Sequence, residues 1–99
     1  MTDAPRSAIV RTVFTRRFVI RQIEIAGRSE RRFVAAEWRD AIVRVARGSL
    51  ELECVDGQRS TFATGALLCV DGLSLVALRN RRLDPLVLVA ASRAARLLS

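Results

Sequence analysis

The chain has 99 residues, of which 51% are hydrophobic, and a formal net charge of +7. This length suits one domain with one core. No apolar run approaches the roughly 18 residues that a membrane-spanning helix needs, and the N-terminus lacks the apolar segment of a signal peptide, so we expect a cytoplasmic protein. All seventeen basic residues are arginine. A GC-rich genome and a selected binding surface would both produce this bias.

The N-terminal third reads as two strands and an ambiguous segment. Residues 8–14 and 17–25 are apolar and rich in β-branched residues, which predicts strands, and residues 26–29 form a turn. Residues 30–38 fit either a strand or one turn of helix, because Ala and Glu suit a helix whereas Phe and Val suit a strand. We favour the strand.

The stretch from residue 40 to residue 80 contains four short apolar runs that are separated by turns at Gly48, Gly57, Gly65 and Gly72. Strands of five to seven residues between such turns are typical of antiparallel sandwiches and barrels. The dipeptide Asp56-Gly57 predicts a type I′ hairpin turn. The sequence therefore predicts an all-β, antiparallel fold.

Three runs predict which faces are covered. In residues 49–55 the side chains of Leu50, Leu52 and Cys54 fall on one face, and Glu51 and Glu53 on the other, which we interpret as the solvated face of a half-buried strand. Residues 66–70 and 86–91 are apolar throughout, so both are predicted as central strands that are covered on both faces.

The domain is expected to span residues 8–92. Residues 1–7 lack periodicity and are expected to form a flexible arm. Residues 93–99 form a tail that is either a short helix or frayed. The two cysteines, Cys54 and Cys69, lie in apolar strand patterns, and the chain has no His with which to complete an ordinary zinc site. We expect both thiols to be reduced and buried.

The order of strands and glycines resembles the cupin family of small jelly-roll β-barrels. The second motif of that family is Gly, five residues, Pro-x-Gly, two residues, His, three residues and Asn. Here Gly65 and Asn80 stand at the outer positions, Gly72 lies one residue early, and Val76 occupies the His position, or Leu75 if the register slips with the glycine.

The first cupin motif, a Gly with two His, a Glu and a closing Gly, matches only in outline between Gly27 and Gly48, and its spacing is one residue too long. Its metal-ligand positions fall near Phe33, Ala35 and Asp40. The resemblance covers about residues 20–91 and implies a cupin-like jelly roll, or double-stranded β-barrel.

The activity of metal-dependent cupins is not carried over, because a chain without His cannot reproduce the ligand set of imidazoles and a carboxylate. We expect no metal and no cofactor. Nucleophilic catalysis would need a base beside a Cys or Ser, and neither His nor Lys is available. The glycines are isolated and form no phosphate-binding loop. Binding is therefore favoured over catalysis.

Two sets of residues are candidates for binding. An apolar interior that is either packed shut or open to a small molecule would be lined by Trp38, Leu50, Leu52, Cys69 and Leu75. Trp38 suits a lid over the core better than a ligand platform. An anion-binding rim would form if two arginine clusters meet at one end of the barrel: Arg28, Arg31 and Arg32 in one, and Arg79, Arg81 and Arg82 in the other.

Two hypotheses follow. The first is a metal-free, cupin-like module that binds a small molecule or is purely structural. The second is a homodimeric interaction protein that binds nucleic acid or an acidic partner through the arginine clusters; nucleic acid is the less favoured partner because exposed aromatic side chains and a recognition helix are not evident. A homodimer is expected in either case, because the apolar runs exceed what a 99-residue interior needs.

Overall fold

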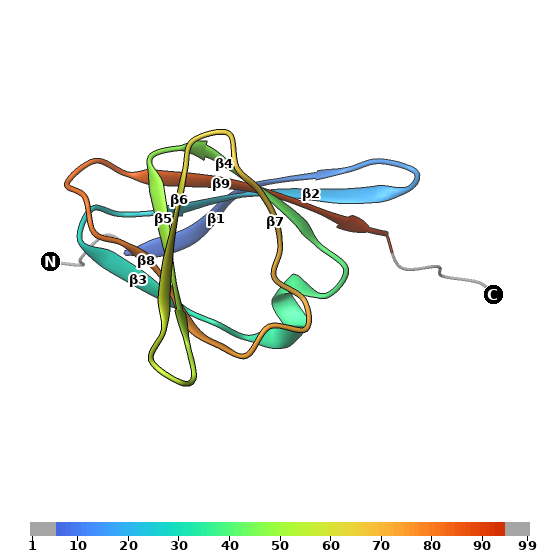
Figure 1. Ribbon diagram of the computed structural model, residues 1–99. Helices are drawn as coiled ribbons and strands as arrows, with labels where there is room; N and C mark the ends of the chain where they lie inside the picture. The colour runs from blue at the N-terminus through green and yellow to red at the C-terminus, as the bar shows by residue number, and fades with distance from the viewer. Residues whose placement is uncertain (1–5, 95–99) are drawn as a thin grey trace, which may run out of the picture.

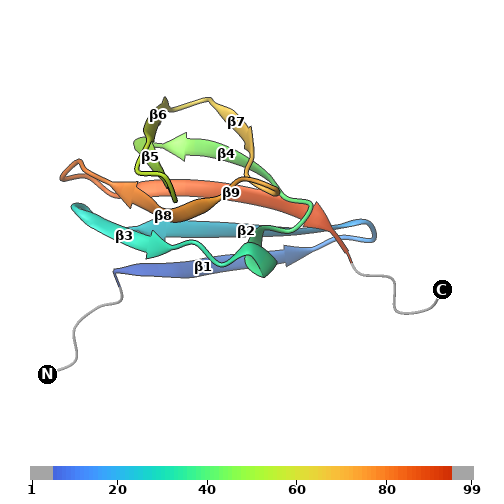
Figure 2. The same cartoon turned by 60° about the horizontal axis from the view of Figure 1, so that its bottom comes forward.

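The computed structural model describes residues 6–94, which form two antiparallel β-sheets that face each other (Figures 1 and 2). The five-stranded sheet has the order β1 (Ser7–Phe14), β2 (Phe18–Ile25), β9 (Leu86–Arg93), β4 (Ile42–Arg47) and β7 (Leu67–Cys69). The four-stranded sheet has the order β3 (Ser29–Arg32), β8 (Leu75–Asn80), β5 (Ser49–Cys54) and β6 (Arg59–Ala63). The predicted all-β, antiparallel class is confirmed.

The apolar side chains that alternate along the central strands meet between the two sheets. The residues with no exposed surface include Ile23 on β2, Val43 and Val45 on β4, Leu50 on β5 and Leu88 on β9. A period of two places every second side chain on the same face of a strand, so these alternating positions make one continuous core. Within residues 6–94, no helix is long and apolar enough to cross a membrane.

The expected domain edges lie close to the observed strand ends. Strand β1 begins at Ser7 and β9 ends at Arg93, so each extends one residue beyond the expected limits of 8 and 92. The expected arm and tail otherwise fall mainly on residues 1–5 and 95–99, outside the described part.

The prediction that residues 66–70 form a central strand is wrong. Strand β7 is a short edge strand that pairs only with β4, and 66% of Leu67 is exposed. Strand β9 is central, as expected, but its burial alternates between buried and half-buried positions. An apolar run shows that a strand is hydrophobic but does not show how many neighbours cover it.

Residues 30–38, which were expected to form a strand, divide into two elements. Ser29–Arg32 form β3, and Ala35–Trp38 form a single 3₁₀ turn, η1. The turn places Trp38 in the core with no exposed surface. Both readings of this ambiguous segment were therefore partly right.

The β5–β6 hairpin is not the predicted type I′ turn. That turn needs positive φ at two consecutive residues, whereas only Gly57 has it, at +89°; Asp56 is not among the residues with positive φ. The backbone N–H of Gly57 donates to the carbonyl of Cys54 at 2.9 Å. The loop is thus longer, with glycine in the one left-handed position.

Candidate anion-binding site

The two arginine clusters meet where β3 begins and β8 ends. These strands pair antiparallel, with Ser29 opposite Asn80 and Arg32 opposite Ala77. The turn before β3 and the loop after β8 therefore lie side by side at one end of the four-stranded sheet, although about fifty residues separate them in sequence. The backbone N–H of Arg28 donates to the carbonyl of Arg82 at 2.9 Å and joins them directly.

Asn80 holds this end of the sheet together. It is only 2% exposed, and its Nδ2 donates to the carbonyls of Ile25 at 3.1 Å, Ala26 at 3.2 Å and Asp84 at 2.7 Å. Its Oδ1 accepts the backbone N–H of Arg82 at 3.1 Å. A buried amide whose polar atoms are all bonded stabilises one backbone arrangement, so the loops that carry the arginines are fixed in place.

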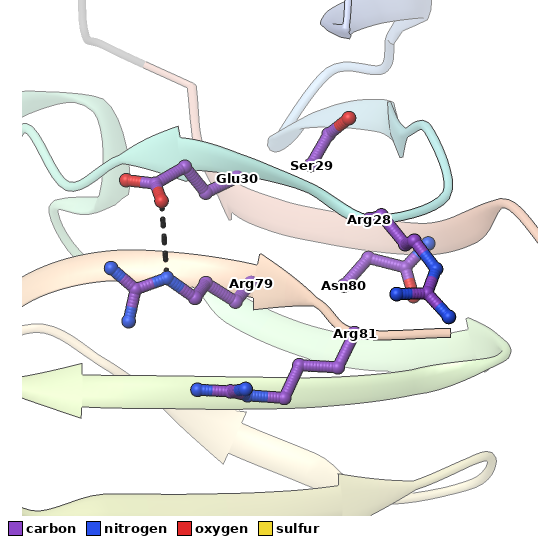
Figure 3. A pocket seen from close by; sticks show the side chains of 6 residues that line it. All are labelled: Arg28, Ser29, Glu30, Arg79, Asn80 and Arg81. Carbon is purple, nitrogen blue, oxygen red and sulfur yellow. Dashed lines mark hydrogen bonds and ion pairs between the residues drawn. The ribbon is translucent and has the colours of Figure 1, made fainter. Parts of the chain in front are cut away.

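A hollow of about 240 Å³ opens over this junction and is lined by Arg28, Ser29, Glu30, Arg79, Asn80 and Arg81 (Figure 3). Arg28 and Arg81 lie beside Asn80, whereas Arg79 and Glu30 lie together farther along the strands (Figure 3). Three guanidinium groups from two parts of the chain, the turn before β3 and the end of β8, thus surround one small space.

Ion pairs position two of these arginines. Arg79 donates through Nε to Glu30 at 3.1 Å and through Nη1 to Glu53. Arg81 Nε donates to Glu51 Oε2 at 2.5 Å. The hydrogen bond to Glu30 raises the pKa of the Arg79 guanidinium above its usual value, because bonding to a carboxylate favours the charged form.

Arg28 and Arg82 supply the positive charge that is not neutralised. Within residues 6–94, no carboxylate lies within ion-pair distance of either guanidinium, whereas Arg59, Arg79 and Arg81 are matched by three glutamates. We call Arg28, Arg79, Arg81 and Arg82 the arginine rim. Its excess charge and its fixed backbone favour an anion over a cation.

The other two candidate arginines point elsewhere. Arg31 donates to both carboxylate oxygens of Glu37, with Nε to Oε1 at 2.9 Å and Nη2 to Oε2 at 2.5 Å, and its Nη1 donates to Ser7 Oγ on β1 at 2.8 Å. It therefore ties the edges of the two sheets together. Its hydrogen bond to Glu37 raises its pKa. Arg32 is exposed on β3 opposite Ala77 and lines none of the hollows described here.

The proposed apolar interior is packed. Trp38 and Leu50 have no exposed surface, and Leu52 and Leu75 are 4% and 7% exposed; none of the four lines a hollow described here. Cys69 does not belong with them. It is exposed and lies at a surface hollow beside β7, so its predicted burial is wrong, because β7 is an edge strand whose outer face is uncovered. Cys54 is half-buried.

Trp38 closes the core against β2. The guanidinium of Arg21 lies 5.6 Å from the centre of the indole ring, and Arg21 Nη2 donates to the carbonyl of Glu37 at 2.6 Å. This supports the interpretation of Trp38 as a lid over the core. Its Nε1 is buried and has no hydrogen-bond partner among the described residues.

Of the positions that correspond to cupin metal ligands, only Asp40 carries a side chain that can coordinate a metal. The backbone N–H of Phe33 donates to the carbonyl of Val76 at 2.9 Å, so the two motifs do meet. Phe33 packs against the core, and Ala35, Asp40 and Val76 are exposed. Among the described residues, no three Cys, Asp or Glu side chains are grouped closely enough to hold a metal ion.

Glu51 is the residue whose role the sequence analysis missed. It was expected on a solvated face, yet it is 8% exposed, and its Oε1 is buried without a hydrogen-bond partner. Neighbouring strands cover it, because it lies between Thr61 on β6 and Arg79 on β8. The signal in the sequence is the set of arginines at matching positions of those strands, which becomes visible only once the pairing is known.

Comparisons with solved structures identify the fold. A cupin domain of an XRE family transcriptional regulator from Enterobacter cloacae superposes with a TM-score of 0.69 at 21% identity, covering 93% of this chain and 100% of that chain. An RmlC-like cupin with a double-stranded β-helix fold from Methanocaldococcus jannaschii gives 0.68 at 15% identity, covering 94% and 84%. A cupin domain from Bordetella pertussis gives 0.67 at 17%, covering 96% and 100%.

A scan against protein-family models and a search of curated proteins give no match. The assignment of the fold therefore rests on structural similarity, which agrees with the resemblance of the glycine pattern. This chain has the double-stranded β-barrel fold of the cupin superfamily.

Proposed function

We propose that this protein is a non-catalytic cupin-fold module that binds a small anionic molecule at its arginine rim, outside the barrel. The observation that carries the proposal is the hollow of about 240 Å³ that Arg28, Arg79 and Arg81 surround on a backbone held by Asn80. Each guanidinium presents a planar fork of donors that matches the oxygens of phosphate or carboxylate.

The rim is suited to binding because its members differ in their restraints. Arg79 and Arg81 are oriented by Glu30, Glu53 and Glu51, which limits the rotamer entropy that binding would cost. Arg28 and Arg82 add charge without a carboxylate partner among residues 6–94. An anion in the rim hollow therefore gains new charge-assisted hydrogen bonds from Arg28 without breaking an ion pair, and Arg82, which lines the adjacent hollow, adds positive charge nearby.

Catalysis is not part of the proposal. The acidic residue that lines the rim hollow, Glu30, is half-exposed and bonded to Arg79, and the chain contains neither His nor Tyr to act as an acid or base near neutral pH.

The test is calorimetric titration with inorganic phosphate and citrate at about 50 mM salt. The double variant Arg28→Ala/Arg82→Ala is expected to weaken binding at least tenfold, since each charge-assisted bond contributes about 1.5–3 kcal/mol. Arg44→Ala/Arg47→Ala, on β4 of the other sheet, removes the same charge and is the matched control. Wild-type protein that binds neither anion, or equal losses in both variants, would contradict the proposal.

Nucleic acid is the alternative ligand. Duplex and single-stranded DNA titrated under the same conditions distinguish it, because several phosphate contacts make affinity fall steeply with salt. Tight, salt-sensitive binding of DNA with negligible binding of phosphate or citrate would show that the ligand of the rim is a polyanion and not a small anion.

We also propose that the protein forms a homodimer through the outer face of the five-stranded sheet. Strand register places five side chains in one row across all five strands: Cys69, Ile42, Ala91, Ile20 and Val13. Ile42 is 53% exposed and Val13 39%. A two-fold axis along this row would lay apolar surface on apolar surface. It would place Arg11 and Arg44 of one copy on the opposite side of the axis from Arg11 and Arg44 of the other copy.

A further inference from the structure

Glu51 presents a buried acceptor beside the arginine rim. Its side chain is 10% exposed. Oε2 accepts Arg81 Nε at 2.5 Å, whereas Oε1 is buried and accepts no hydrogen bond from the described residues. Arg59 Nε lies 3.9 Å from Oε1, which is within ion-pair range but too long for a hydrogen bond. An ionised acceptor in this state is costly unless a donor reaches it.

The surroundings of Glu51 make a second hollow of about 180 Å³, lined by Ser49, Glu51, Thr61, Arg81 and Arg82. Arg81 lines both this hollow and the hollow of the rim, so the two are adjacent. The second hollow differs in chemistry from the first. It combines a carboxylate and two hydroxyl groups, which hydrogen-bond to hydroxyls, with two arginines, which bind anions.

A simple anion fits this combination poorly, because Glu51 repels it. A cation fits poorly as well, because Arg81 and Arg82 flank the carboxylate. A ligand that satisfies both carries a hydroxyl donor for Oε1 and, a few bonds away, an anionic group for the arginines. We propose that the ligand of the arginine rim is a phosphorylated sugar, with its phosphate on the rim and a ring hydroxyl donated to Glu51 Oε1, which becomes accessible when the half-exposed side chain of Arg59, 3.9 Å away, turns aside. This inference rests on the proposed function and assigns it a ligand class.

The test compares three probes on the wild-type protein: ribose 5-phosphate, 2-deoxyribose 5-phosphate and methyl phosphate. A hydrogen bond from a hydroxyl to an ionised acceptor contributes about 1.5–3 kcal/mol, so ribose 5-phosphate is expected to bind about tenfold or more tightly than methyl phosphate. The deoxy sugar shows whether the 2-hydroxyl is the donor. If it matches ribose 5-phosphate, another ring hydroxyl donates.

Glu51→Gln is expected to reduce the preference for ribose 5-phosphate over methyl phosphate to below about threefold and to leave or improve the affinity for methyl phosphate, since it removes a negative charge. Glu53→Gln, two residues along the same strand, loses a carboxylate that is bonded to Arg79 and is expected to retain the preference. A lost preference in both variants would contradict the assignment to Glu51.

The outcomes separate this inference from the proposed function. Binding of methyl phosphate with no preference for either sugar phosphate by the wild-type protein overturns the inference and leaves the anion site intact. Failure of all three probes to bind overturns both. The wild-type comparison does not depend on the folding of any variant, so the inference stays testable if Glu51→Gln is unstable.

Discussion

The α-carbon of Gly27 lies so close to the backbone of Leu83 that it has no room for a side chain: a β-carbon there would lie 2.0 Å from the carbonyl oxygen of Leu83. The contact joins the turn between β2 and β3 to the loop between β8 and β9. Next to it, Arg28 N–H bonds to Arg82. Close approach of two backbones thus brings the two arginine clusters together.

Gly27→Ala is therefore expected to destabilise the fold by about 1–3 kcal/mol and to weaken anion binding, because the two loops must separate. Chemical denaturation measures the first effect and calorimetry the second. Gly57→Ala is the control: a β-carbon there has open space, although φ is +89°, so it should cost about 1 kcal/mol of backbone strain and leave binding unchanged. Unchanged stability of Gly27→Ala would show that the loops are not in contact.

Asn80→Ala is expected to lower the free energy of unfolding by about 1–3 kcal/mol, because it leaves the buried carbonyl of Ile25 and the partly buried carbonyl of Asp84 without their donor. The substitution should also reduce anion affinity, although Asn80 carries no charge, because it loosens the loop that carries Arg82. Urea denaturation and calorimetry on the same samples check both. A variant with lower stability but full affinity would show that Asn80 does not position the rim.

The sequence was sufficient for the pattern within each strand. Leu50 and Leu52 alternate with glutamates, and Gly48, Gly65 and Gly72 occur at turns with positive φ; both are local properties of the backbone. The position of a strand in the sheet is not local. The run at Leu67 was predicted to be central because an apolar pattern does not distinguish a central strand from an edge strand that leaves hydrophobic surface exposed.

The same limit explains why the candidate site could be predicted only in part. The sequence left open whether Arg28 and Arg81 meet. They line the same hollow because β3 pairs with β8 across about fifty residues, which periodicity does not encode. Arg31 could have been separated in advance, because alternation puts it on the opposite face from Glu30 and Arg32. Glu51 could not, because its burial depends on Arg59, Arg79 and Arg81 from neighbouring strands.

In folded protein diluted below the concentration at which it dimerises, Cys69 is expected to react rapidly with a thiol reagent, and Cys54 more slowly, because the first is exposed in the single chain and the second half-buried and reaction requires access to the thiolate. Labelling with Ellman's reagent, followed by mass spectrometry, assigns the two rates. Cys69→Ser should abolish the fast phase. A fast phase that persists in this variant would come from Cys54 and would contradict the assignment of the fast rate to Cys69.

Ile42→Glu is expected to shift the protein to a monomer at micromolar concentration, because it places a charge in the middle of the apolar row on the five-stranded sheet. Light scattering measures the mass. Val55→Glu, at the β5–β6 loop, changes an even more exposed side chain, at 69%, and should leave the dimer intact. A wild-type protein that is monomeric under these conditions would remove the proposed dimer.

Sulfate binding at the arginine rim is expected to be constant between about pH 6.5 and 9. Hydrogen bonding to Glu30 raises the pKa of Arg79, so its charge in the folded state is complete at every pH below the ordinary arginine value and is lost only as the pH rises through the raised value, far above this window. The chain has no His or Lys that would titrate in between.

Sulfate is the appropriate probe because, unlike phosphate, it does not change its own charge in this range. Calorimetric titrations at three pH values and constant ionic strength measure the affinity, with Arg28→Ala/Arg82→Ala as the variant that should lose it at every pH. An affinity that changes more than about threefold across the window would mean that a group with a pKa near neutrality contributes. Since arginine cannot be that group, such a result would place the anion site away from the rim.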